Sequence, residues 1–317
     1  MSGKRSGPEV QVADAAGIAA AAALLRQGKP VALPTETVYG LAARADSDSA
    51  VAAIYAAQGR PSFNPLIVHV SDLEQGELVA AFDWRAIALA ATFWPGALTM
   101  VLPLRPDARI AAAVTAGLPT IALRCPAHPV MRAVLAATGL PLAAPSANRS
   151  GGVSPTTAAH VAGSLHGRIE LVLDGGPCET GLESTIVALR GNGTWQMLRP
   201  GPIAAEQIAA VLETGPEVVG AATIEAPGQL ARHYSPGKPV RLGAKSGEPE
   251  EFMIGFGAVD GAINLSPAGD LAEAAVRLYA ALHAAVQAPQ PKVAVALIPA
   301  EGLGAAINDR LRRAASD

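Results

Sequence analysis

Polar side chains of only a few kinds lie at the ends of the short apolar runs in the first two thirds of the chain. They comprise three arginines, one histidine and several hydroxyl and amide side chains. In chain order they are Thr35, Thr37, Arg60, Asn64, His69, Thr120, Arg124, Ser146, Asn148, Ser184, Thr185 and Arg199. Arginine binds phosphate or carboxylate with two parallel hydrogen bonds, and hydroxyl groups can add further ones. The set therefore predicts a pocket for oxyanions.

Each of these residues alone also has an ordinary structural explanation. Hydroxyl and amide side chains commonly stabilise the turns at strand ends. His69 lies on an apolar run at 65–70, where a histidine is more often buried in a core. The repetition of polar groups at one strand end after another favours a shared pocket, because ligands of open α/β sheets bind there.

Other familiar sites do not match the sequence. It has no obvious Ser-His-Asp set or carboxylate pair, and no G-x-x-x-x-G-K-[ST] motif. The glycines after Gly255 miss the spacing of a dinucleotide loop. Cys125 and Cys178 are far apart and have no clustered histidines, so neither a disulfide framework nor a zinc site is predicted. We expect no metal held by the protein itself.

The spacing of apolar residues predicts an α/β fold. Helices are expected at about 14–27, 47–58, 83–93, 129–138 and 156–162, and later at about 270–287 and 304–315. Runs rich in β-branched residues between the earlier helices predict strands at 30–35, 65–70, 98–104, 119–124, 142–147, 169–176 and 184–189. This alternation indicates a mostly mixed sheet with flanking helices.

Proline and glycine divide the chain into two unequal parts. They crowd the segment 227–240, which also contains His233 and Tyr234. We predict a catalytic domain at 1–226, a linker that serves as a lid at 227–240, and a small α/β domain at 241–317. A plain linker would not need an aromatic pair.

The composition is that of a packed globular protein. The chain has 317 residues, of which 50% are hydrophobic and 16% charged, and its net charge of −3 lacks the basic excess typical of nucleic-acid binders. The longest apolar window, 86–104, is interrupted by Pro95 and Gly96, so we expect no membrane span. With two cysteines and no signal-peptide pattern, a cytoplasmic location is expected.

Seven segments between residues 13 and 201 carry a specific resemblance. They are LPTETVYGLA, GRPSFNPLIVHV, FWPGALTMVLP, ALRCPAHP, PLAAPSANRSGGVSPT, VLDGGPCETGLESTIV and LRPG. In this order they resemble the threonylcarbamoyl-AMP synthase family of YrdC-like enzymes. The segments APGQLARHYSP and GLGAAINDRLRRAA are similar to its longer form. The resemblance implies a YrdC-like twisted mixed sheet with flanking helices and a small Rossmann-like C-terminal domain.

The resemblance also implies an activity. Such an enzyme is a nucleotidyltransferase that joins L-threonine, bicarbonate and ATP into threonylcarbamoyl-adenylate, releases pyrophosphate, and uses Mg²⁺ on the ATP phosphates. A downstream transferase then modifies an adenosine of tRNA, and contact with tRNA itself is possible. Carried over motif by motif, the threonine set is Thr35, His69, Arg124 and Ser184. The ATP set is Arg60, Asn64, Thr120, Ala144, Ser146, Ser154, Arg199 and Tyr234, and the catalytic set is Gln58, Arg60, Ser146 and Asn148.

Gln58 departs from the family pattern. The family loop normally reads Lys-Gly-Arg-Pro, whereas this chain reads Gln-Gly-Arg-Pro. Glutamine forms hydrogen bonds but carries no charge, so the pocket lacks one cation. The substitution is expected to lower activity, unless the chain has a different task or another cation, such as Arg149, takes the place of the lysine.

Two rival functions remain open from the sequence. A carbamoyltransferase-related paralogue would share the catalytic domain, but its usual cysteine-rich motifs are missing here. A module that binds double-stranded RNA or tRNA would use a concave face of the same fold, and the net acidity argues against that as the main role.

Overall fold

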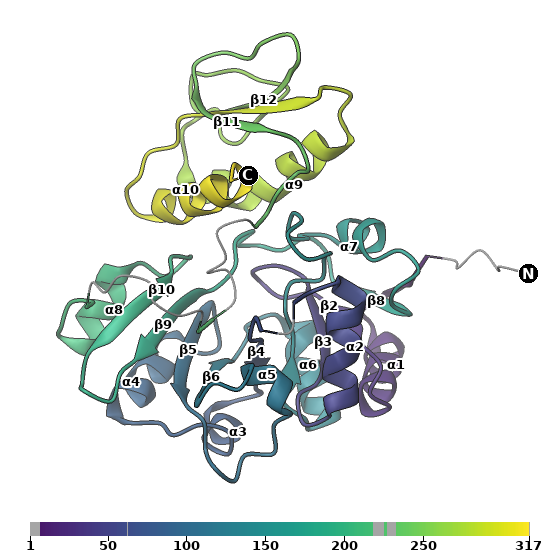
Figure 1. The fold of residues 1–317 in the computed structure, drawn as a ribbon, viewed down its shortest axis with the longest axis vertical. Helices are drawn as coiled ribbons and strands as arrows, with labels where there is room; N and C mark the ends of the chain where they lie inside the picture. The colour runs from purple at the N-terminus through teal and green to yellow at the C-terminus, as the bar shows by residue number, and fades with distance from the viewer. Residues whose placement is uncertain (1–6, 62, 218–224, 227–232, 317) are drawn as a thin grey trace, which may run out of the picture.

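The larger part of the molecule is built on one ten-stranded sheet (Figure 1). The structure is a computed structural model that describes residues 7–61, 63–217, 225–226 and 233–316. In spatial order the strands are β1 (Glu9–Val12), β8 (Leu171–Asp174), β2 (Val31–Leu33), β3 (Gly40–Arg44), β7 (Leu142–Ala143), β4 (Ile67–His69), β6 (Thr120–Arg124), β5 (Leu98–Pro103), β9 (Thr185–Leu189) and β10 (Trp195–Arg199). Parallel and antiparallel pairs both occur, which confirms the expected mixed sheet.

Helices of this part are α1 (Ala15–Arg26), α2 (Asp48–Gln58), α3 (Leu73–Glu77), α4 (Trp84–Phe93), α5 (Ala112–Thr115), α6 (Pro129–Thr138), α7 (Ala158–Ser164) and α8 (Ala205–Leu212). Five of them, α1, α2, α4, α6 and α7, begin and end close to where the sequence predicts, whereas α3, α5 and α8 are not predicted from it. Asp14 and Ser47 cap α1 and α2 by accepting backbone N–H bonds. Gly59 ends α2 in the left-handed conformation at φ 62°, which turns the chain into the loop before β4.

The smaller part contains a separate four-stranded parallel sheet. Its order is β11 (Val240–Ala244), β14 (Lys292–Ala296), β12 (Glu251–Gly255) and β13 (Ile263–Asn264). Helices α9 (Leu271–Gln287) and α10 (Leu303–Ala314) lie on the side of this sheet that faces the larger part (Figure 1). The two-part α/β fold expected from the sequence is therefore confirmed. Of the expected linker at 227–240, residues 227–232 lie outside the described residues.

The two parts share a hydrophobic core. Val38, Val153 and Leu182 of the larger part are buried in the same cluster as Leu278 and Tyr279 of α9. The loop before β9 approaches α9 so closely that a Cβ on Gly181 would lie 2.5 Å from the backbone of α9. A larger side chain at 181 would force the parts to separate.

A stacked pair of histidines also joins the two parts. The rings of His160 on α7 and His283 on α9 are stacked with their centroids 3.8 Å apart. Burial lowers the pKa of His160 to about 4 and also lowers that of His283. Both rings are therefore neutral at pH 7.

The histidine pair predicts a pH dependence of stability. Between pH 6.5, the ordinary histidine pKa, and about 4, the unfolded chain binds protons that the folded chain does not. The free energy of unfolding should therefore fall as the pH drops through this range. Urea unfolding of the wild type and of His160→Phe, which keeps a flat ring, measures the effect. The free energy of unfolding should depend less steeply on pH in the variant than in the wild type. Equal slopes for the two proteins would show that His160 does not cause the pH dependence.

No helix in the described ranges is long and apolar enough to cross a membrane.

Candidate active site

A small pocket lies where several strand ends of the large sheet meet. Its cavity has a volume of about 40 Å³. Its lining contains Thr35, Thr37, Val38, Gly40, Arg60, Ile67, His69, Arg124, Ala144, Pro145, Ser146, Glu183, Ser184, Arg199, His233 and Tyr234. Most of the side chains expected to bind threonine and ATP are therefore brought together. Of the expected residues, Gln58, Asn64, Thr120, Asn148 and Ser154 are not part of the lining.

The strand register explains this convergence. His69 and Arg124 are paired at the ends of the parallel neighbours β4 and β6. Thr120 begins β6 while Arg124 ends it, so these two residues lie at opposite ends of the strand. Ser184 directly precedes β9 and Arg199 ends its antiparallel partner β10. The sheet thus directs side chains that are distant in the sequence to one edge.

Arg124 is held on three sides. Its Nε donates to the Gly96 carbonyl at 3.1 Å, and its Nη1 donates to Thr37 Oγ1 at 2.8 Å. Its Nη2 forms an ion pair with Glu36 Oε1 at 2.7 Å. Burial opposes ionisation of Glu36, but the positive charge of Arg124 outweighs it and lowers the carboxyl pKa. The guanidinium is therefore fixed in place and partly neutralised by the protein.

His69 is a neutral ring beside that arginine. Burial, and then the positive charge of Arg124, lower its pKa to about 3. Its Nδ1 has no hydrogen-bond partner among the described residues. A buried imidazole with an unused ring nitrogen in a pocket wall can donate to or accept from a bound ligand.

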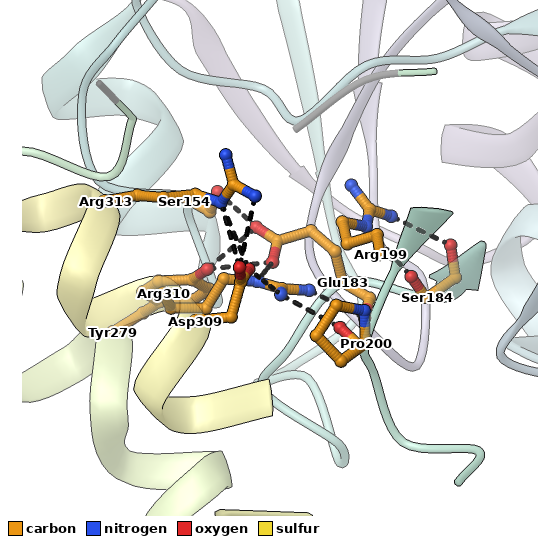
Figure 2. A network of polar contacts seen from close by, with 9 residues as sticks. All are labelled: Ser154, Glu183, Ser184, Arg199, Pro200, Tyr279, Asp309, Arg310 and Arg313. Atoms are coloured by element: carbon orange, nitrogen blue, oxygen red, sulfur yellow. Dashed lines mark hydrogen bonds and ion pairs between the residues drawn. The ribbon is translucent and has the colours of Figure 1, made fainter. Parts of the chain in front are cut away.

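Arg199 is a second cationic group of the lining. Arg199 Nε donates to the Ser184 carbonyl at 3.0 Å, and Nη2 donates to Ser184 Oγ at 3.1 Å (Figure 2). Thr99 Oγ1 lies 2.7 Å from the same hydroxyl oxygen. Ser184 and Arg199 therefore form one rigid unit.

Arg60 enters from the loop after α2. Its Nη2 donates to the Pro65 carbonyl at 3.0 Å. Burial lowers its pKa to about 10, which leaves the guanidinium charged at pH 7. Asn64, four residues further on, is buried outside the lining, and its Oδ1 has no partner among the described residues. Among the described residues, the pocket lining thus contains three arginines with fixed positions.

Tyr234, in the segment that joins the two parts, lines the pocket. It is 1% exposed, and its ring packs against those of His233 and Tyr279. Its backbone takes a positive φ of 63°, which is uncommon for a residue other than glycine. Pockets for drug-sized ligands usually measure several hundred Å³, so we expect Tyr234 and His233 to move when a nucleotide binds.

Gln58 is buried beside the pocket, and its amide nitrogen donates to backbone carbonyls of the protein rather than into the cavity. Its Nε2 donates to the carbonyls of Ser146 at 2.5 Å and Asn148 at 3.1 Å. Asn148 in turn donates to the carbonyls of Arg149 and Gly152. Gln58 therefore fixes the loop that carries Ser146. Arg149 lines a separate groove rather than this pocket, so the side chain proposed as a substitute cation does not line the same cavity.

Two changes at position 58 should have opposite effects. Gln58→Ala removes the donor from two backbone carbonyls, which costs about 1 to 3 kcal/mol, and should lower turnover roughly tenfold. Gln58→Lys keeps a donor there and adds a positive charge next to Ser146, so turnover should rise about tenfold. Pyrophosphate release by the three forms measures both effects. An alanine form as active as the wild type, or a lysine form no faster than it, would contradict the respective claim.

Two acidic residues of the pocket were missed by the sequence analysis. Glu36 and Glu183 line the cavity, but a pocket for anions gives no reason to expect carboxylates. Each directly adjoins a predicted site hydroxyl in the sequence, in TET and EST. That adjacency was the only signal that could have identified them.

The chain is similar to known proteins over most of its length. Residues 23–201 match the Sua5/YciO/YrdC family, described as telomere recombination, and residues 203–316 match the threonylcarbamoyl-AMP synthase C-terminal domain. The threonylcarbamoyl-AMP synthase of Bacillus subtilis (strain 168) is 41% identical, over 94% of this chain and 92% of its own length. The chain belongs to the threonylcarbamoyl-AMP synthase family.

Other proteins similar to this chain differ in length. The crystal structure of P. abyssi Sua5 complexed with L-threonine superposes with a TM-score of 0.85 at 35% identity and covers 94% of both chains. A putative threonylcarbamoyl-AMP synthase of Mycobacterium tuberculosis (strain ATCC 25618 / H37Rv) is 40% identical over 62% of this chain and 89% of its own length. The family therefore includes shorter chains that match only part of this one.

Proposed function

We propose that the pocket joins L-threonine, bicarbonate and ATP into threonylcarbamoyl-adenylate and pyrophosphate, for threonylcarbamoyladenosine modification of tRNA. The observation that carries the proposal is the set of charged side chains in the described lining of the pocket. Three arginines with fixed positions line it, and its two carboxylates, Glu36 and Glu183, are each paired with an arginine. The net charge that remains suits several anionic groups held close together. The L-threonine bound to the Sua5 relative from P. abyssi supports an amino-acid substrate.

The reaction needs no nucleophile from the protein. The amine of threonine attacks the carbon of bicarbonate, and loss of water gives a carbamate. A carbamate oxygen then attacks the α-phosphate of ATP, and pyrophosphate leaves. The task of the protein is to bring three substrates together and to offset their negative charge.

The arginines of the lining suggest a division between substrates, with Ser184 at the boundary because its hydroxyl accepts from Arg199. We assign the carboxylate of threonine to Arg124, with the unused nitrogen of His69 and the hydroxyls of Thr35 and Ser184 beside it. We assign the phosphates to Arg60 and Arg199, together with Ser146. Tyr234 would lie over the nucleotide and keep water from the labile product once the pocket has reopened and closed again.

Mg²⁺ fits this pocket only as a companion of ATP. The described residues contain no group of three histidine, cysteine, aspartate or glutamate side chains that could hold a metal ion. Both carboxylates of the lining are already engaged by arginines. The ATP phosphates would therefore supply most of the ligands, and the metal would add further positive charge at the leaving pyrophosphate.

Pyrophosphate release tests the proposal. The full chain is incubated with ATP and Mg²⁺, and threonine or bicarbonate is omitted in turn. Release should require both, and serine in place of threonine should release less. Release that is independent of threonine, or no release at all, would contradict the proposal.

A further inference from the structure

A buried network of polar side chains connects the smaller part to the wall of the pocket (Figure 2). The carboxylate of Glu183 is at its centre. It accepts hydrogen bonds from Ser154 Oγ at 2.6 Å, from Tyr279 OH at 2.8 Å and from Arg310 Nε at 2.8 Å. Tyr279 is on α9 and Arg310 is on α10, and both are fully buried. The smaller part thus supplies two of the three donors to this carboxylate.

Arg310 contacts both strand ends that form one side of the pocket. Besides Glu183, it donates through Nη1 to the carbonyl of Pro200 at 2.9 Å. Glu183 directly precedes Ser184, and Pro200 directly follows Arg199. Arg310 therefore bridges the open end of the β9–β10 pair, next to the two side chains that face the pocket.

The backbone at this end is closely packed. A Cβ on Gly201 would lie 2.4 Å from the backbone nitrogen of Thr185. The two chain segments can approach in this way only because residue 201 has no side chain. A small displacement of either segment would move Ser184 relative to Arg199.

Arg310 also offsets the negative charge of Glu183. Burial raises the pKa of Glu183, but the positive charges of Arg310 and then Arg199 outweigh it and hold the pKa at about 2. Glu183 is therefore an ionised carboxylate between two arginines. Arg310 satisfies this carboxylate and does not line the pocket, whereas Arg199 does. Without Arg310, the buried carboxylate would attract Arg199 instead.

We propose that Arg310 is a positioning residue for the substrate pocket: it engages Glu183 and Pro200, and so keeps Ser184 and Arg199 directed at the substrates. The inference rests on the proposed function, since it assumes that Arg199 binds a phosphate of ATP. It gives the C-terminal part a defined effect on affinity for the nucleotide, separate from its effect on stability.

Calorimetric binding of ATP to the full chain, together with pyrophosphate release, tests the proposal. Arg310→Met should weaken ATP binding at least about tenfold, which is about 1.4 kcal/mol. Arg310→Lys should give a smaller loss. The double variant Arg310→Met with Glu183→Gln should recover roughly threefold or more of the lost affinity, because no carboxylate then competes for Arg199. Arg312→Met, an exposed arginine on the same helix, is the matched control and should bind ATP as the wild type does.

The outcomes separate positioning from simple stabilisation. If Arg310 only stabilised the fold, the melting temperature would fall in the single and double variants alike, with no change in ATP affinity. That result, or a double variant that binds ATP no better than Arg310→Met, would overturn the proposal. If Arg310→Met fails to fold, the ATP affinities of Arg310→Lys, the double variant and the wild type are compared with one another instead. If the wild type binds ATP but releases no pyrophosphate in response to threonine, the proposed function is contradicted. The ATP affinities of the Arg310 variants can still be compared in that case.

Discussion

Replacement of Arg124 by alanine is expected to remove most threonine-dependent activity while ATP affinity changes little. The side chain has three contacts in the free protein, to Gly96, Thr37 and Glu36. Its loss removes the cation assigned to the threonine carboxylate and leaves Glu36 as an unpaired buried carboxylate. Hydrogen bonds to charged groups contribute about 1.5 to 3 kcal/mol each, so the KM for threonine should rise about a hundredfold.

Arg199→Ala is the matched comparison for Arg124→Ala. It should raise the KM for ATP about tenfold or more and the KM for threonine much less, because we assign Arg199 to the phosphates and Arg124 to the threonine carboxylate. Arg132→Ala, an exposed arginine on α6, serves as the control. Steady-state kinetics, with ATP and threonine varied in turn, give both KM values for the three variants and the wild type. Equal losses for both substrates in both pocket variants would refute the division of roles.

Ending the chain after Ala226 should lower the melting temperature, the ATP affinity and the rate of pyrophosphate release. We propose that residues 1–226 fold by themselves, because the large sheet and its helices have a core of their own. The cut nevertheless exposes Val38 and Leu182 and deprives Glu183 of Arg310 and Tyr279. Loss of a buried charge partner costs about 3 to 5 kcal/mol, so the melting temperature should fall by roughly 10 °C.

The shortened chain should also bind ATP poorly and release pyrophosphate slowly. Both Tyr234, which covers the pocket, and Arg310 are lost. Adding Glu183→Gln to the shortened chain should recover part of the ATP affinity, because it removes the carboxylate that competes for Arg199. Thermal melting and calorimetry measure these effects. A shortened chain with the melting temperature and ATP affinity of the full chain would show that the smaller part has neither role.

The sequence predicts the parts of the pocket that depend on local pattern. Thr35, His69 and Arg124 follow or end apolar runs and Ser184 directly precedes one, so a shared pocket at the strand ends could be inferred. The caps at Asp14 and Ser47 likewise follow from residue type and spacing. These features require no knowledge of which strands are neighbours.

The remaining features depend on contacts between distant segments. The carboxylate of Glu183 is acceptable in an anion pocket only because Arg310, 127 residues later in the chain, neutralises it. The amide of Gln58 lies against Ser146 and Asn148 rather than in the cavity, which depends on a loop 88 residues away. Neither partner can be inferred from local spacing, since the side-chain direction is set by tertiary packing.

Incorporation of labelled bicarbonate tests the central claim most directly. The full chain is incubated with ATP, Mg²⁺, L-threonine and ¹³C-bicarbonate, and the products are separated rapidly and analysed by mass spectrometry. The account predicts an adenylate that contains threonine and the labelled carbon, formed in step with pyrophosphate and missing when threonine is omitted. Pyrophosphate release without this labelled adenylate would contradict it.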